Sequence, residues 1–222
     1  MLPTLSPTNL LRAAGLILVA ALSLSALPVN AQAQAPKTAP YIELTPPQPT
    51  ENGDKVEVIE FFWYGCPHCY AFEPVLEPWS KKLSKDVVFR RVPAIFNDQW
   101  GVAARVFYTL EAIGEQERLH RALFDAIHKD NLRITDESAM AAWLGKQKVD
   151  VEKYKAAYRS FTIETKLKRA LQMTQAYRMD GVPALAVQGR YVLTAGMIND
   201  RQELLRATDI VIAEAIKRLP KK

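Results

Sequence analysis

Two cysteines, Cys66 and Cys69, are the only ones in this sequence of 222 residues, and two residues separate them. They lie in the segment FFWYGCPHCYAFEP, residues 61–74, among aromatic side chains. A Cys-x-x-Cys pair can brace a fold as a disulfide, supply two ligands to a metal ion, or exchange disulfides as a redox pair. The neighbouring residues decide among these three chemistries.

A metal site needs more ligands than the sequence offers. Tetrahedral zinc takes four ligands. In addition to the two thiols, the sequence offers only three histidines, His68, His120 and His128. The two distant histidines do not form a close ligand pair, so zinc is a weak alternative. Attachment of a c-type haem requires histidine directly after the second cysteine, where this sequence has Tyr70. We therefore predict no metal and no cofactor.

A bracing disulfide is also a weak explanation of the pair. Residues three apart on a helix have Cβ atoms about 5–6 Å apart, whereas a relaxed disulfide prefers about 3.8 Å. The loop that the bridge would close is very short, so it removes little entropy from the unfolded chain. A bridge formed under such constraint is easily reduced, which favours a redox role.

The residues around Cys66 fit a redox pair. Cys66 falls at the predicted start of a helix, where free backbone N–H groups and the helix dipole lower the pKa of a thiol. Pro67 suits the first helical position, which needs no N–H, and His68 can stabilise the thiolate by charge or hydrogen bonding. We predict that Cys66 is the exposed nucleophile and that Cys69, one turn further, is the buried resolving thiol.

Two glutamates flank the cysteine pair. Glu60 shares a strand face with Val58 and Phe62, so we expect it to be buried. Burial would raise its pKa and let it hold a proton near neutral pH. A partly exposed glutamate at the end of a strand is the alternative. For Glu73 we expect an exposed position on the following helix.

The elements that must position these residues follow from the patterns around them. Residues 55–64, KVEVIEFFWY, are apolar on both faces and predict a strand inside a parallel or mixed sheet. Residues 67–83 have helical spacing, and residues 86–96 predict a second strand. Residues 183–193 predict two short strands joined by a turn at Gln188–Gly189.

Helical periods dominate the rest of the chain. They recur from residue 98 to residue 177, and a last amphipathic helix is predicted over residues 201–219. This order predicts an α/β fold with a mixed sheet, flanking helices and a helical insertion. We divide the chain into a signal peptide (1–31), the first part of the sheet domain (32–97), the helical insertion (98–165) and the second part (166–222).

The first 31 residues have the pattern of a secretory signal peptide. Residues 13–29 are an apolar run, and the small residues after it predict cleavage after Ala31 or Ala33. An uncleaved membrane anchor is the weaker alternative, because crossing a bilayer takes about 20 apolar residues. We therefore expect an exported protein in a compartment where disulfides persist.

The charge pattern gives no sign of a nucleic-acid partner. The formal net charge is +5, and Arg12 is the only charged residue among the first 31. Basic residues are frequent over residues 146–169, but acidic and apolar residues are interleaved with them, which is typical of a solvated helix face. The sequence has no phosphate-binding glycine loop and no repeat of fixed period. We expect no binding of nucleic acid.

Two segments resemble one family. Residues 60–74, EFFWYGCPHCYAFEP, resemble the active-site strand and helix of the DsbA family of periplasmic thiol:disulfide oxidoreductases. Residues 181–196 provide a second match, in which Val182 precedes Pro183. The resemblance implies a thioredoxin-like fold and a cis bond before Pro183, with Val182 and Pro183 binding substrate. It also implies that a buried acid at Glu60 helps to deprotonate the second cysteine.

The resemblance also implies an activity and partners. The protein would donate a Cys66–Cys69 disulfide to unfolded exported proteins with free thiols. A DsbB-like, quinone-linked membrane oxidase would then reoxidise it, and we expect a periplasmic monomer. One alternative is a disulfide reductase or isomerase, although the Pro-His pair between the cysteines is that of the oxidase. The other is a thioredoxin-fold binding protein with an incidental Cys-x-x-Cys pair.

Overall fold

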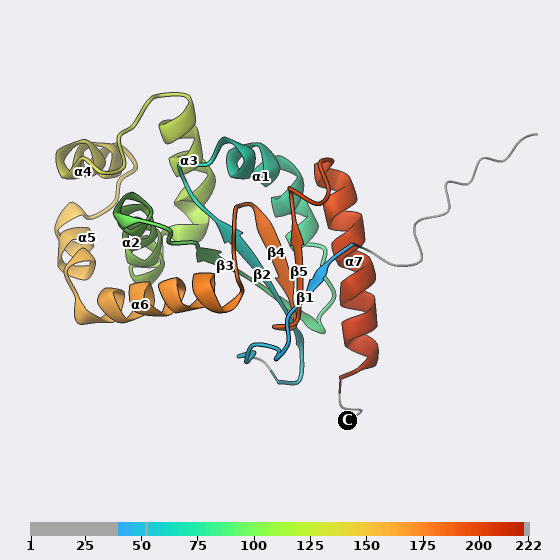
Figure 1. Cartoon of the computed structure of the whole chain (residues 1–222). Helices are drawn as coiled ribbons and strands as arrows, with labels where there is room; N and C mark the ends of the chain where they lie inside the picture. The colour runs from blue at the N-terminus through green and yellow to red at the C-terminus, as the bar shows by residue number, and fades with distance from the viewer. Residues whose placement is uncertain (1–39, 52, 220–222) are drawn as a thin grey trace, which may run out of the picture. The chain divides into compact units, whose positions relative to one another are not determined.

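The computed structural model describes residues 40–51 and 53–219 of the chain (Figure 1). The predicted signal peptide and both predicted cleavage positions lie outside these residues. The described part forms one mixed sheet flanked by helices, and the predicted α/β architecture is confirmed. None of the described helices combines the length and apolar character needed to cross a membrane.

The sheet has the strand order β1-β5-β4-β2-β3. Strand β2 pairs with β3 in parallel and with β4 antiparallel, so it lies between the two. The predicted hairpin is the antiparallel pair β4–β5, and the short β1 extends the sheet beside β5. The strands are β1 Ile42–Glu43, β2 Val56–Phe62, β3 Val87–Pro93, β4 Ala184–Val187 and β5 Tyr191–Thr194.

Strand β2 is buried along its whole length. Successive side chains of a strand point to opposite faces, and both faces of β2 are covered. Val56 and Val58 belong to the core on one face, whereas Ile59 and Phe61 belong to the core on the other. This burial explains why residues 56–62 are apolar on both faces apart from two glutamates.

Helices cover both faces of the sheet. The core on one face is formed with α1 and α7, and the core on the other face is formed largely with α2, α3 and α6. The helices are α1 Pro67–Ser80, α2 Asp98–Ala112, α3 Gln116–His128, α4 Glu137–Lys146, α5 Val151–Tyr158, α6 Phe161–Ala176 and α7 Arg201–Lys217. Helices α2 to α6 follow one another between β3 and β4 (Figure 1). The boundary drawn at residue 165 falls within α6, and the division of the chain into parts stays a prediction.

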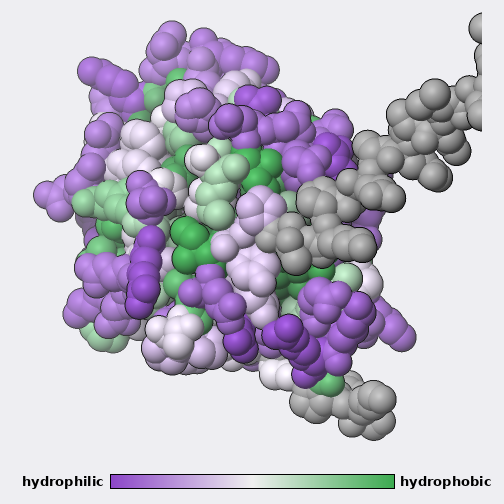
Figure 2. All heavy atoms as spheres, turned by 45° about the vertical axis from the view of Figure 1, so that its right-hand side comes forward, coloured by the Kyte–Doolittle hydropathy of each residue, from purple (hydrophilic) through white to green (hydrophobic). Residues whose placement is uncertain are grey.

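The two cores anchor the segment that carries the cysteines. Phe72 and Leu76 of α1 are fully buried against the strands and α7, and burying each such side chain contributes about 1.5–3 kcal/mol to stability. Helix α1 thus holds a fixed place over β2. On the face shown in Figure 2, hydrophilic side chains predominate and hydrophobic ones form patches between them.

Candidate active site

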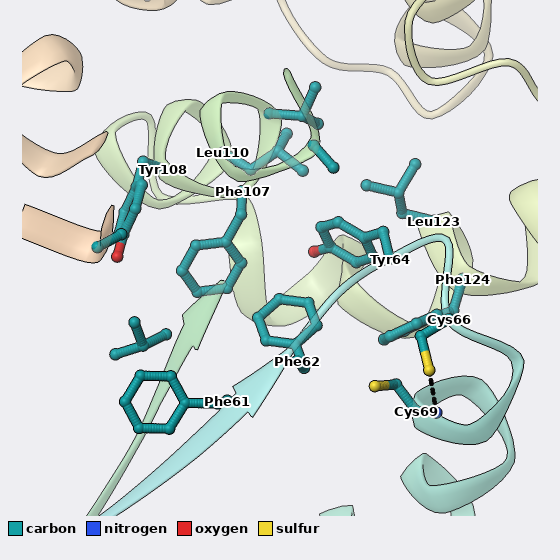
Figure 3. Close-up of a cluster of buried hydrophobic side chains, with 14 of the residues drawn as sticks. Phe61, Phe62, Tyr64, Cys66, Cys69, Phe107, Tyr108, Leu110, Leu123 and Phe124 are labelled. Carbon is teal, nitrogen blue, oxygen red and sulfur yellow. Dashed lines mark hydrogen bonds between the residues drawn. The ribbon is translucent and has the colours of Figure 1, made fainter. Parts of the chain in front are cut away.

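Cys66 lies at the start of α1, as its spacing predicts. It occupies the N-cap position with extended backbone angles, and Pro67 follows in the first turn. The N–H of Cys69 donates a hydrogen bond to the Cys66 sulfur at 3.4 Å (Figure 3). An N-cap side chain commonly accepts such a bond from the second or third helical residue. The sulfur of Cys66 therefore takes the place of a capping oxygen.

The two cysteines differ in their access to solvent. Cys66 is 7% exposed and Cys69 is fully buried. Both are free thiols, which corresponds to the reduced form of the pair. The order of exposure agrees with the predicted roles, although Cys66 offers only a small part of its surface to solvent.

The two thiols also differ in pKa. The pKa of Cys66 is lowered to about 6, first by a hydrogen bond from the Cys69 thiol and then by the backbone N–H groups of Cys69 and His68. Partial burial opposes this lowering, and the nearby His68 side chain adds to it. Burial raises the pKa of Cys69 well above its usual range, and the hydrogen bond to Cys66 raises it further. At neutral pH the pair is therefore a thiolate at Cys66 and a thiol at Cys69.

The segment before β4 lies beside the cysteines. The Val182–Pro183 bond is cis in the structure. The Cys66 sulfur lies 3.5 Å from the Val182 carbonyl, to which it donates a hydrogen bond when it is protonated, although 116 residues separate the two in sequence. Pro183 is buried and Val182 is half-buried, whereas Pro67 and His68 are exposed. The structure thus brings Val182 next to the sulfur, and the roles predicted for these residues in binding substrate stay predictions.

Glu60 is fully buried, which excludes the alternative of a partly exposed carboxylate. The parallel register places Glu60 opposite Arg91 of β3, and Arg91 Nε donates to Glu60 Oε2 at 2.9 Å. Burial raises the pKa of Glu60 to about 8, the charge of Glu73 adds to this, and Arg91 offsets it only in part. Among the described residues the other oxygen, Oε1, has no hydrogen-bond partner. This oxygen is free to carry the proton.

The expectation of an exposed Glu73 is wrong. Glu73 is 1% exposed, because it follows Cys69 by one helical turn and so lies on the same inward face of α1. Its carboxylate accepts hydrogen bonds from Arg91 at 3.1 Å and pairs with His120 at 3.1 Å. Burial acts to raise the pKa of Glu73, but the bonds with His120 and Arg91 outweigh it and lower that pKa.

Arg91 and His120 complete a charged network that sequence reasoning missed. Arg91 bridges Glu60 and Glu73, and His120 connects Glu73 to the hydroxyl of Tyr64 at 2.9 Å. Burial lowers the pKa of His120, although Glu73 opposes this. Glu73, Arg91 and His120 line a cleft of about 990 Å³. The network therefore extends from beneath the cysteines to an open cleft.

A Glu60→Gln variant should change the pH dependence of stability. The folded pKa of about 8 lies above the ordinary value of 4.5, so the favourable contribution of Glu60 is complete below pH 4.5 and is lost as the pH rises to about 8. We expect Glu60→Gln to raise the free energy of unfolding at pH 8 by about 1–3 kcal/mol, because the lost bond to Arg91 offsets part of the gain. Denaturant unfolding at several pH values measures this. A gain of equal size at pH 4 would contradict the raised pKa.

No set of three or more His, Cys, Asp or Glu side chains within residues 40–51 and 53–219 is placed to hold a metal ion. His120 is engaged by Glu73 and Tyr64. His128 contacts the backbone carbonyl of Tyr64 at 2.8 Å. Neither distant histidine thus joins the cysteines as a ligand.

Comparison with known sequences identifies relatives that cover most of the chain. A family model described as "DSBA-like thioredoxin domain" matches residues 57–208. The "Thiol:disulfide interchange protein DsbA" of Pseudomonas aeruginosa is 42% identical over 172 residues, which cover 78% of this chain and 82% of the relative. The protein of the same name from Azotobacter vinelandii is 38% identical over 201 residues, covering 89% and 94% of the two chains.

Comparison with solved structures gives the same relatives. The crystal structure of Pseudomonas aeruginosa DsbA matches with a TM-score of 0.77 at 41% identity, covering 80% of this chain and 92% of the other. That of oxidoreductase DsbA from Xylella fastidiosa matches with a TM-score of 0.74 at 30% identity, covering 79% and 94%. The resemblance carried by two short motifs thus extends over most of the fold.

Proposed function

Since this chain belongs to the DsbA family, we propose how its two cysteines carry out thiol:disulfide interchange. The chain is a protein disulfide oxidoreductase that introduces disulfide bonds. The observation that carries the proposed mechanism is the asymmetry of the pair: Cys66 is partly accessible with a pKa of about 6, and Cys69 is fully buried with a raised pKa.

The oxidised pair acts in two exchange steps. A substrate thiolate attacks the Cys66 sulfur, the Cys66–Cys69 bond breaks, and Cys69 leaves with the bonding electrons. A second substrate thiolate then attacks the substrate sulfur of this mixed disulfide, and Cys66 leaves as a thiolate. The substrate loses two electrons and gains a disulfide, and the enzyme is left reduced. The low pKa of Cys66 makes it a good leaving group in the second step.

Glu60 is the proposed proton donor and acceptor for Cys69. The pKa of Cys69 is raised, so the departing Cys69 thiolate takes up a proton, and it must lose that proton again when the pair is reoxidised. Glu60 is buried, has one unpaired carboxylate oxygen and has a pKa of about 8, so it can hold a proton at neutral pH. Its charge also contributes to the raised pKa of Cys69. A group whose pKa lies near the working pH is suited to give and take protons.

Val182 and Pro183 form the proposed binding ledge for the substrate chain. The Val182 carbonyl lies within hydrogen-bond distance of the Cys66 sulfur. A backbone ledge of this kind can pair with an extended peptide, whose main-chain bonds do not depend on its side chains. His68 and Pro67 complete the site at the first turn of α1, where the N–H and side chain of His68 stabilise the Cys66 thiolate.

The partners and compartment follow from the family. We propose that the substrates are unfolded exported proteins with free thiols, and that a DsbB-like, quinone-linked membrane oxidase restores the disulfide. The protein would act in the periplasm as a monomer, after removal of a signal peptide at residues 1–31 or 1–33. The helical insertion and its proposed boundaries at residues 98 and 165 belong to the same set of proposals.

Equilibration with glutathione tests this function. We expect a pair that is more oxidising than thioredoxin, whose potential is about −270 mV, because the low pKa of Cys66 stabilises the reduced form. The fraction of oxidised protein across a series of glutathione ratios gives the potential. A thioredoxin-like value would favour a disulfide reductase.

A second assay addresses the binding-protein alternative. Oxidative refolding of a reduced substrate protein should depend on Cys66, so Cys66→Ala serves as the inactive control. If Cys66→Ala assisted refolding as well as the natural chain did, the protein would be a binding protein and not an oxidase.

A further inference from the structure

Tyr64 is held at both ends by helix α3. It lies in the turn between β2 and α1, two residues before Cys66. Its hydroxyl is 2.9 Å from Nδ1 of His120, and its backbone carbonyl is 2.8 Å from Nε2 of His128. A carbonyl oxygen can only accept, so Nε2 of His128 carries the hydrogen in this contact. Helix α3 therefore forms hydrogen bonds with both the side chain and the backbone of Tyr64, the residue that precedes Gly65 and Cys66.

The Tyr64 carbonyl that His128 contacts belongs to the central peptide of a tight turn. The N–H of Cys66 donates to the carbonyl of Trp63 at 3.0 Å, which places Tyr64 and Gly65 at the two middle positions. The central peptide of such a turn has two orientations, and one of them requires a positive φ at the third residue. Only Gly114 and Gly189 have a positive φ among the described glycines. The Tyr64–Gly65 peptide thus has the orientation that needs no positive φ, and glycine at position 65 would also allow the other one.

The space around position 65 also favours glycine. A Cβ atom built on Gly65 would lie 2.3 Å from the ring of Trp63. A side chain at this position would require the Trp63 ring to move. Glycine at position 65 leaves the turn beside Cys66 with more conformational freedom than another residue would. A hydrogen bond from outside the turn can therefore fix the orientation of the Tyr64–Gly65 peptide. His128 makes the hydrogen bond that does so.

The imidazole of His128 is itself held in place. Its ring stacks on Tyr70 with centroids 4.6 Å apart and an angle of 5° between the planes. The Tyr70 hydroxyl donates to Asp125 at 2.7 Å, and Asp125 also pairs with Lys129 and Arg121. Because Tyr70 belongs to α1, the stack fixes the His128 ring relative to the helix that carries the cysteines.

We infer that His128 is a positioning residue for Cys66, acting through the carbonyl of Tyr64. By fixing the central peptide of the turn, it sets the position of the Cys66 sulfur against the N–H of Cys69, 3.4 Å away. The inference rests on the proposed role of Cys66 as the sulfur that exchanges with substrate. His128 itself touches neither sulfur nor substrate in this assignment.

Two variants of His128 test the inference. His128→Phe keeps a flat ring against Tyr70 and removes the donor, whereas His128→Gln retains an N–H that can reach the carbonyl. For His128→Phe we expect the equilibrium with glutathione to shift about fivefold toward the oxidised enzyme, the effect of losing one ordinary hydrogen bond, here the bond from the Cys69 N–H to the Cys66 thiolate that the displaced turn would no longer align. The absorbance of the Cys66 thiolate, titrated in the reduced protein, should show its pKa moving upward. His128→Gln should stay within about twofold of the natural chain.

Several outcomes would overturn the assignment. One is a His128→Phe protein that is less stable to heat but has an unchanged thiolate titration, because the role would then be structural only. Another is equal behaviour of the Phe and Gln variants. Nitrogen NMR of the natural chain gives a check that needs no variant: His128 should carry its hydrogen on Nε2, and the Nδ1–H tautomer would contradict the inference. A natural chain with a thioredoxin-like potential would refute the proposed oxidase while leaving these comparisons valid.

Discussion

A Cys69→Ser variant is expected to accumulate mixed disulfides with substrate proteins, whereas Cys66→Ser should accumulate at least about tenfold less. Both variants should lose oxidase activity, because neither can form the internal disulfide. In Cys69→Ser the Cys66 thiolate attacks a disulfide of a partner, and the resolving thiol that would release the product is missing. In Cys66→Ser the remaining thiol is fully buried with a raised pKa.

Both access and ionisation contribute to this difference in trapping between the two variants. At pH 7 a thiol with a pKa of about 6 is ionised about thirtyfold more than one with the ordinary value of about 8.5. The intrinsic reactivity of a thiolate falls with its pKa, by about tenfold over the same interval. Against an ordinary thiol these two effects nearly cancel. The raised pKa of Cys69 lowers its ionised fraction further, and its complete burial limits the access of a partner.

Non-reducing gels of the purified variants, incubated with a protein that has native disulfides, measure the trapped species. The double variant Cys66→Ser/Cys69→Ser is the matched control for complexes that are not disulfide-linked. Equal trapping by the two single variants would contradict the assignment of Cys66 as the attacked sulfur.

The second large effect is a change of sign in redox-dependent stability. In acid the oxidised protein should be the more stable form, by about 1.9 kcal/mol from closing the four-residue loop. The reduced protein gains from the Cys66 thiolate, whose folded pKa of about 6 lies below the unfolded value. A lowered pKa contributes stability that is complete above the unfolded value of about 8.5 and is lost as the pH falls through about 6.

This gain is at most about 3.4 kcal/mol, and it equals the loop contribution between about pH 7 and pH 8. Above that point the reduced form should be the more stable one. Denaturant unfolding of both forms from pH 5 to pH 8 measures the difference, over a range in which Cys69 of the unfolded chain stays mostly protonated. A Cys66→Ser protein, which lacks both the bridge and the thiolate, should not show the rise with pH. If the oxidised form still had the larger free energy of unfolding at pH 8, the proposed stabilisation of the thiolate would be wrong.

Local patterns in the sequence were sufficient to predict the elements and the reactive pair. The doubly apolar segment around Ile59 predicted the buried strand β2, and Pro67 predicted the start of α1. These features depend on neighbours in sequence, whose spacing can be read directly. The burial of Glu73 could also be predicted from its spacing, because it shares the inward helix face of Cys69, but a charged side chain on a helix favours the wrong expectation of exposure.

The rest of the charged network could not be predicted from local patterns. Arg91 meets Glu60 only through the parallel register of two strands, and register depends on how the whole sheet packs. His120 reaches Glu73 from a helix that lies 47 residues further along the chain. The sequence around His120 shows an ordinary amphipathic helix, with no sign that it contacts the active site.

The central position of β2 in the sheet has a consequence for the folding and first oxidation of a new chain. One edge of β2 pairs with β4, which follows only after helices α2 to α6. A chain exported from its N-terminus, as proposed above, therefore presents both thiols until the whole helical region has crossed the membrane and β4 can cover that edge. During this interval the polypeptide is itself unfolded and carries two free thiols. A nascent copy is then the kind of molecule proposed above as a substrate, and a finished copy can supply its first disulfide.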